Sequence, residues 1–355
     1  MEAVDISMHL YFISIKSKNR SVPAGRQCVF DRPDNRSTYR LERIVFHMRF
    51  DGYRSLSTCA VMSFGILCAP GVHASESGQV HYPLGVNTIM NAALPGPGET
   101  GFYSYSQYYW SDRLNDGDGR SLDPNFKVEV LAEAPRIVHN WGTKIGPFFV
   151  ASAAITPITH VKLQAFGRRD ESTGFGDPVI SPVYLYHVNK KGNFFAYFGP
   201  DIYVPIGKYD KSRLANNASH YWAVAPNASV TWLPTPKWEV STTVYSEFNW
   251  ANRATGYRSG DALSVDLAVA HRPIEALPRL KVALQGYAHK QISDDKIDGV
   301  AVPGGNRGQA FALGPQISYD IAGGRGGILL KYQREFAVEN RSLGNRLWFE
   351  LAFPL

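Results

Sequence analysis

The chain has 355 residues, of which 44% are hydrophobic and 13% aromatic, and its formal net charge is +6. No apolar run approaches the roughly 18 residues that a membrane-spanning helix needs. This composition excludes a helical membrane protein, so any membrane location must depend on strands.

Residues 48–74 are expected to form a secretory signal peptide. Arg49 and Arg54 give it a positive start, and residues 56–69 are mostly apolar. Val72-His73-Ala74 then places small residues at the two positions that determine cleavage. Cleavage after Ala74 would make Ser75 the mature N-terminus. The alternative interpretation is a buried helix of an N-terminal domain.

Residues 1–47 are basic and irregular, and they precede a signal that should be N-terminal. The simplest interpretation is a start codon assigned too early, with Met48 as the true first residue; the alternative is a disordered or regulatory extension. Removal of residues 1–74 would lower the net charge from +6 to about +2. It would also remove all three cysteines, Cys28, Cys59 and Cys68. Thiol catalysis and Cys-zinc sites are therefore excluded, and no nucleic-acid partner is expected.

Residues 75–99 are rich in glycine and proline, too short for a domain and poorly suited to a spanning strand. We expect them to form a plug-like segment at the periplasmic mouth of a barrel, folded inward against Lys281, Arg346 and Glu350. Such a plug would block ions and leave a route for a larger, mostly apolar solute.

Residues 100–355 read as strands of alternating apolar and polar residues joined by turns and loops, without a convincing helix. Short turns are expected at 140–144, 190–192, 234–236, 274–278 and 321–325, and longer polar loops at 111–124, 157–177, 205–218, 251–260 and 292–307. The expected strands are 100–110, 125–138, 145–156, 178–189, 193–204, 219–233, 237–250, 261–273, 279–291, 308–320, 326–338 and 343–355. Short turns that alternate with long loops are typical of outer-membrane barrels, with the short turns in the periplasm.

The C-terminal residues 345–355 give the clearest alternation. Leu347, Phe349, Leu351 and Phe353 form one apolar face, and the interleaved face carries charges. Such a strand suits lipid on one side and a polar lumen on the other. We expect the barrel assembly machinery to recognise it, although the chain ends in Pro354-Leu355 rather than in an aromatic residue.

The predicted fold is all-β: a transmembrane antiparallel up-and-down β-barrel of about 12 strands in the outer membrane of a Gram-negative bacterium. The alternative is a periplasmic or secreted β-sandwich, whose strands are usually only five or six residues long. Outer-membrane lipid is the expected surrounding of the barrel.

The alternation also predicts which ionisable side chains face the lumen. Either a paired network fills the barrel or a polar constriction selects solutes, since buried charges need partners. The predicted lumen-lining residues are Glu239, Glu247, Asp266, Lys281, His289, Lys331, Glu335, Arg346 and Glu350.

No catalytic residue, metal ligand or cofactor is expected. The sequence has no Gly-x-Ser-x-Gly nucleophile elbow and no His-Glu-x-x-His zinc motif. A barrel enzyme acting on lipids and a non-transporting structural barrel stay open as alternatives to a transporter.

A series of short motifs spread over residues 80–355 carries a family resemblance. They are Tyr82-Pro-Leu-Gly85, Pro95-Gly-Pro-Gly98, Gly176-Asp177-Pro178, Pro205-Ile-Gly-Lys-Tyr-Asp210, Ser259-Gly-Asp261, Gln291-Ile-Ser-Asp-Asp295, Gly314-Pro315, and Glu339-Asn-Arg341 followed by Gly344-Asn-Arg-Leu-Trp348. Together they resemble the meta-pathway phenol-degradation family of outer-membrane proteins, which includes the sphingosine-induced outer-membrane protein group. Ile206 departs from the family pattern, where a hydroxyl residue is usual. The resemblance implies an outer-membrane barrel for passive uptake of small hydrophobic, aromatic or long-chain catabolic substrates.

Overall fold

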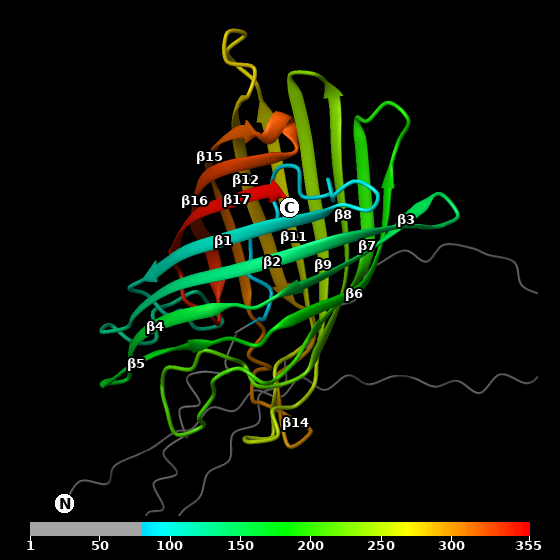
Figure 1. Ribbon diagram of the computed structural model, residues 1–355. Helices are drawn as coiled ribbons and strands as arrows, with labels where there is room; N and C mark the ends of the chain where they lie inside the picture. The colour runs from blue at the N-terminus through cyan, green and yellow to red at the C-terminus, as the bar shows by residue number, and fades with distance from the viewer. Residues whose placement is uncertain (1–79) are drawn as a thin grey trace, which may run out of the picture. The chain divides into compact units, whose positions relative to one another are not determined.

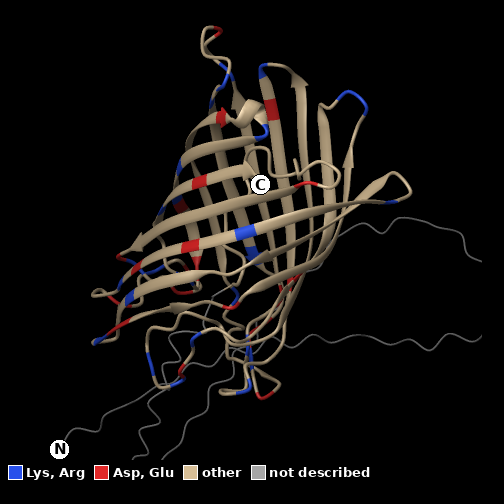
Figure 2. Ribbon diagram, in the orientation of Figure 1, with Lys and Arg blue, Asp and Glu red and all other residues tan. Residues whose placement is uncertain are grey.

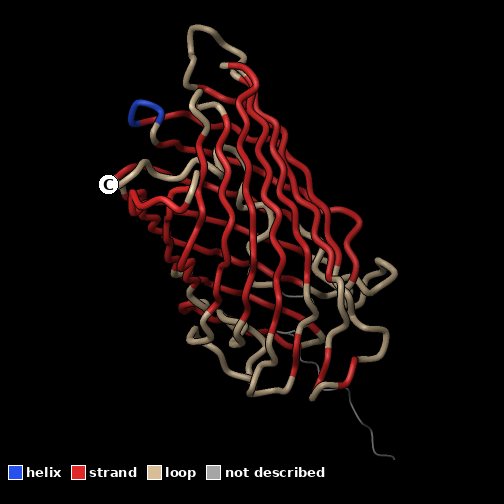
Figure 3. Tube along the Cα trace, turned by 90° about the vertical axis from the view of Figure 1, so that its right-hand side faces the viewer, coloured by secondary structure: helices blue, strands red, loops and turns tan. Residues whose placement is uncertain are grey.

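The computed structural model describes residues 80–355, so residues 1–47, the expected signal peptide 48–74 and the Ala74–Ser75 cleavage site lie outside the described residues. Within the described part, twelve antiparallel strands form a closed barrel (Figures 1 and 3). They are β1 (Thr100–Ser111), β2 (Lys127–Ile145), β3 (Phe148–Ile155), β6 (Val179–Val188), β7 (Phe194–Tyr203), β8 (Ala223–Thr235), β9 (Trp238–Asn249), β11 (Ala262–His271), β12 (Leu280–Gln291), β15 (Gln309–Ile321), β16 (Gly326–Glu339) and β17 (Asn345–Pro354).

The barrel closes between its first and last strands. β1 and β17 pair over ten residues, from Gly101 opposite Pro354 to Trp110 opposite Asn345. Closure leaves neither β1 nor β17 with an unpaired edge, which a strand surrounded by hydrocarbon requires. The predicted all-β barrel of about 12 antiparallel strands is therefore confirmed.

Two details of the predicted topology are wrong. Residues 157–177, expected as a loop, contain the hairpin β4 (Ile158–Ala165) and β5 (Arg168–Phe175). β4 pairs with residues 127–133 of β2, because β3 is short and leaves that part of β2 without a partner on one side. Phe166 and Gly167, at the tip of the hairpin, have φ of 50° and 75°, as a tight two-residue hairpin turn requires.

The second error concerns the turn between β2 and β3. Residues 140–144 were expected as this turn, but β2 continues to Ile145, and the chain reverses at Gly146, whose φ is 58°. The register between β2 and β3 shifts between Asn140 and Lys144, so these residues form an irregular ladder. Residues 140–144 resemble a turn in composition because they form this irregular part of the strand, whereas the turn itself follows them.

The two ends of the barrel differ. The short-turn end carries the turns that follow β2, β6, β8, β11 and β15, including the short helical turn η1 (Ala322–Gly324). The long-loop end carries the β4–β5 hairpin and a small sheet of β10 (Tyr257–Arg258), β13 (Lys296–Ile297) and β14 (Val300–Ala301). Among the described residues, no helix is long and apolar enough to cross a membrane.

The burial of the strands is the reverse of that in a soluble protein. In β11, Leu263 and Leu267 are 39% and 49% exposed, whereas Asp266 between them is 0% exposed. Apolar side chains thus cover the outer face and polar side chains face inward, as lipid on the outside demands. Figure 2 shows charged residues in the loops at both ends and at scattered positions on the strands.

Candidate functional site in the barrel lumen

All nine ionisable side chains predicted to face the lumen are buried, with exposed fractions between 0% and 8%. Six of them form three ion pairs. The pairs are Lys281–Glu239 at 3.2 Å, Lys331–Glu350 at 2.5 Å and Arg346–Glu335 at 3.0 Å. In each pair the two side chains come from different strands and meet on the inner face of the barrel. The opposite charges therefore compensate each other where water is scarce.

The remaining three, Glu247, Asp266 and His289, have other partners. Asp266 accepts hydrogen bonds from Tyr82 Oη at 2.6 Å and from the backbone N–H groups of Gly85 and Asn87, both at 3.0 Å. The donors lie in a segment far from β11 along the chain, so the alternation within β11 does not predict these contacts.

Residues 80–99, which precede β1, run through the lumen (Figure 1). The segment begins beside His81, whose ring contacts Glu247 at 3.2 Å and Asp177 at 3.6 Å near the long-loop end. It ends near Asn140 at the short-turn end, where Gly98 N–H donates to the carbonyl of that residue at 2.9 Å. The described part of the segment therefore follows the length of the lumen and is not confined to one mouth.

Backbone carbonyls of this segment bind the paired cations of the wall. Lys331 Nζ donates to Val86 O and Arg346 Nη1 donates to Leu84 O, both at 2.7 Å. Gly85 has φ of 80°, and a Cβ there would lie 2.3 Å from the Gln333 side chain. The positive φ favours glycine, and a larger residue would also have to displace the Gln333 side chain.

The segment was expected to fold against Lys281, Arg346 and Glu350, and it contacts one of them directly and is linked to the other two through a third residue. Arg346 touches the segment directly. Glu350 is linked to it through Lys331, and Lys281 through Glu239, which accepts a 2.5 Å bond from Met90 N–H.

The surroundings of His81 shift the pKa of its imidazole. Burial acts to lower its pKa, but the nearby carboxylates of Asp177 and Glu247 favour the charged imidazole, outweigh burial and raise the pKa to about 9. The imidazole is therefore charged at neutral pH and held between two carboxylates.

A cavity of about 770 Å³ occupies the part of the lumen that the segment leaves free. Its wall along β2 and β4 is apolar. In the register of these strands, Val128 lies opposite Leu163 and Val130 opposite Val161, and all four line the cavity. A volume of this size suits a small organic molecule.

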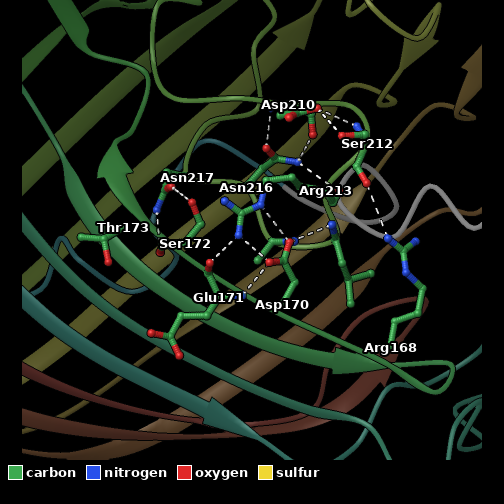
Figure 4. Close-up of polar contacts among 12 residues, drawn as sticks. Arg168, Asp170, Glu171, Ser172, Thr173, Asp210, Ser212, Arg213, Asn216 and Asn217 are labelled. Carbon is green, nitrogen blue, oxygen red and sulfur yellow. Dashed lines mark hydrogen bonds and ion pairs between the residues drawn. The ribbon is translucent and has the colours of Figure 1, made fainter.

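Residues 214–219 line the outer side of the cavity, and this part of the chain is hydrogen-bonded to the β4–β5 hairpin (Figure 4). Asp170 of β5 accepts from Arg213 and from the backbone N–H groups of Leu214 and Ala215, at 3.1 and 3.0 Å. Both of these apolar residues line the cavity. The polar network therefore holds an apolar wall in place.

Arg136 of β2 lies in the cavity lining and was not among the residues predicted from sequence. It shares the inward face of β2 with Ala132 and Ala134, and it stands next to Tyr105 and Tyr184. A lone arginine in an inward-facing apolar run is the signal that could have identified it.

A serine and a histidine also meet inside the barrel, Ser264 Oγ and His289 Nδ1, at 3.0 Å. Both are buried and neither lines the cavity. The other ring nitrogen, Nε2, has no hydrogen-bond partner within the described residues, so no carboxylate orients the imidazole as in a catalytic triad. This pair does not have the arrangement of a hydrolase.

The closed barrel with apolar exterior and charged lumen defines the class: an outer-membrane β-barrel protein. More particularly, the chain belongs to the family described as "Putative MetA-pathway of phenol degradation", whose model matches residues 111–351. The predicted family resemblance is confirmed.

A solved structure has the same fold. The COG4313 outer membrane channel from Pseudomonas putida F1 matches with a TM-score of 0.64 and 16% identity, over 74% of this chain and 97% of that chain. More distant likenesses are the β domain of the Bordetella autotransporter BrkA (TM-score 0.42, 9% identity, 72% and 99% covered) and a Pseudomonas aeruginosa FadL homologue (TM-score 0.37, 7% identity, 78% and 95% covered). The comparison with curated protein sequences gives no significant match.

Proposed function

We propose that this protein is a passive outer-membrane channel for small, predominantly hydrophobic or aromatic solutes. The observation that carries the proposal is the apolar-walled cavity of about 770 Å³ inside the lumen. A water-filled general pore would have polar walls throughout. Here one side of the lumen is lined by aliphatic side chains of β2 and β4.

Residues 80–99 act in this proposal as the plug. They cover the ion-paired wall of the lumen and are held by buried hydrogen bonds to Asp266, Lys331 and Arg346. Hydrated ions then meet either a filled lumen or an apolar wall, whereas an apolar solute gains contact area along β2. The short-turn end faces the periplasm and the long-loop end faces outward, following the usual arrangement of these barrels.

The test compares uptake by whole cells with an intact lipopolysaccharide outer leaflet, with and without the protein, using phenol and a small sugar as solutes. We expect faster entry of phenol only, and little conductance of the purified protein in planar bilayers. Ala132→Trp, which fills the cavity from the inward face of β2, should abolish the gain. Leu131→Trp is the matched control, because Leu131 is 56% exposed on the outer face.

Equal entry of both solutes with high conductance would instead show an open general pore. No uptake gain for either solute, in a folded protein, would contradict a transport role and leave a structural barrel.

A further inference from the structure

Four lysine and arginine side chains are buried in the described residues, and three of them pair with carboxylates. Lys281, Lys331 and Arg346 form the ion pairs with Glu239, Glu350 and Glu335. Arg136 is only 7% exposed and forms no ion pair within the described part of the chain. A buried cation without an anionic partner is costly, so its surroundings need an explanation.

The partners of Arg136 are phenol groups, and the bonds are long. Nη1 lies 3.3 Å from Tyr105 Oη, and Nη2 lies 3.5 Å from Tyr184 Oη. The guanidinium also stands 5.7 and 5.8 Å from the ring centres of Tyr103 and Tyr184, within cation–π range. Its Nε is buried without any hydrogen-bond partner. A guanidinium has five N–H donors in a fixed fork, and at Arg136 the Nε–H donor is unused.

The nearby carboxylate, Asp201, is committed elsewhere. One of its oxygens accepts from Ser181 and Tyr184, and the other accepts from Tyr245 at 3.0 Å. Its negative charge reduces the cost of burying Arg136, but its oxygens are already occupied by hydroxyl donors.

Arg136 stands at one end of the apolar cavity wall. It lies on the same inward face of β2 as Val130, and both line the cavity. They are six positions apart in the strand, a distance on the order of 20 Å along the wall. The cavity therefore has a cationic group at one end and aliphatic side chains along its length.

We propose that Arg136 binds the carboxylate of an organic acid whose apolar part lies along Val130 and the rest of this wall. The planar fork of guanidinium matches the two oxygens of a carboxylate, and such charged bonds are roughly twice as strong as neutral ones. This inference rests on the proposed channel function and adds a preference for aromatic or long-chain carboxylic acids over neutral solutes of the same apolar part.

Direct binding tests the inference separately from transport. The purified full-length barrel in detergent is titrated calorimetrically with decanoate and decan-1-ol, and with benzoate and benzyl alcohol. In at least one of the two pairs, we expect the acid to bind at least tenfold more tightly than the alcohol. A preference for decanoate over decan-1-ol would indicate long-chain acids as ligands. A preference for benzoate over benzyl alcohol would indicate aromatic acids.

The variants are Arg136→Gln, Arg136→Lys and Arg253→Gln. Arg136→Gln should remove the preference for acid and leave alcohol binding unchanged. Arg136→Lys keeps the charge without the fork and should retain part of the preference. Arg253→Gln removes the same charge from an exposed loop position and should change nothing. Heat-modifiable gel migration checks that each barrel is folded.

Equal binding of acid and alcohol by the wild-type protein would overturn the inference, as would an undiminished preference in a folded Arg136→Gln or Arg136→Lys barrel. Either result would leave uptake of neutral solutes, and so the proposed channel function, untouched. Failure of phenol uptake in cells, with acid binding intact, would contradict the channel and leave Arg136 as a ligand site.

Discussion

Tyr82 and Asp266 are 184 positions apart in the sequence, and their side chains form a 2.6 Å hydrogen bond in the centre of the barrel. Asp266 belongs to the wall and Tyr82 to the segment that precedes the first strand. Asp266 is fully buried and also accepts two backbone N–H groups of the segment. This one carboxylate therefore joins the segment to the barrel wall.

Replacing Asp266 by alanine should release the segment. Three donors lose their acceptor, and each buried unpaired donor costs about 1–3 kcal/mol. We expect the barrel to assemble and its ion conductance in planar bilayers to rise several-fold. Asp320→Ala is the control, because the ion pairs of Asp320 are with Lys281 and Arg272 of the wall and not with the segment. An equal rise in both variants would indicate general loosening of the wall instead.

The contact of His81 with Glu247 and Asp177 makes docking of the segment depend on pH. The pKa of His81 in the folded protein is about 9, above its ordinary 6.5. Its stabilising contribution is therefore complete below about 6.5 and is lost as the pH rises through about 9. Conductance should accordingly rise when the pH is taken through roughly 9.

The His81→Gln variant should show a higher basal conductance and a flatter pH profile. His187→Gln serves as the control, since the His187 ring contacts the Pro147 carbonyl at the short-turn end. A wild-type profile without any rise through roughly pH 9 would contradict the role of His81.

Asp170→Ala should free the outer wall of the cavity. The bonds from Arg213 and from the backbone of Leu214 and Ala215 are charge-assisted, at about 1.5–3 kcal/mol each. A cysteine at position 215, with the three natural cysteines replaced by serine, reports the opening, because Ala215 is 1% exposed. We expect maleimide labelling to accelerate on the order of tenfold or more, since 1.4 kcal/mol corresponds to tenfold.

The matched control is Asp118→Ala, since Asp118 pairs with Arg120 in an exposed loop. Labelling that is equally fast in the Asp118 variant, or unchanged in the Asp170 variant, would show that the polar network does not hold the wall.

Processing of the N-terminus stays a prediction from sequence. If residues 48–74 form the signal peptide, the membrane-bound protein begins at Ser75 and contains no cysteine. Intact-mass measurement of the purified barrel checks this, with a thiol assay as an independent readout. Recovery of a chain that starts at Met1 would contradict both the signal peptide and the reassigned start.

The sequence by itself determined the strands and the faces of the barrel. An alternation of period two is a local property, so Leu267 outside and Asp266 inside follow from their order in β11 alone. The sequence did not reveal the β4–β5 hairpin. Pairing of β4 with β2 depends on how much of β2 is left unpaired by the short β3.

Only the tertiary structure decided which buried groups are partners. The alternation assigned Lys331 and Glu350 to the lumen, and the register of β16 and β17 then brought them within 2.5 Å. The course of residues 80–99 and the unpaired guanidinium of Arg136 depend on contacts between segments distant in sequence. A periodic pattern specifies the side of the wall on which a residue lies, whereas its partner across the lumen is set by closure of the whole barrel.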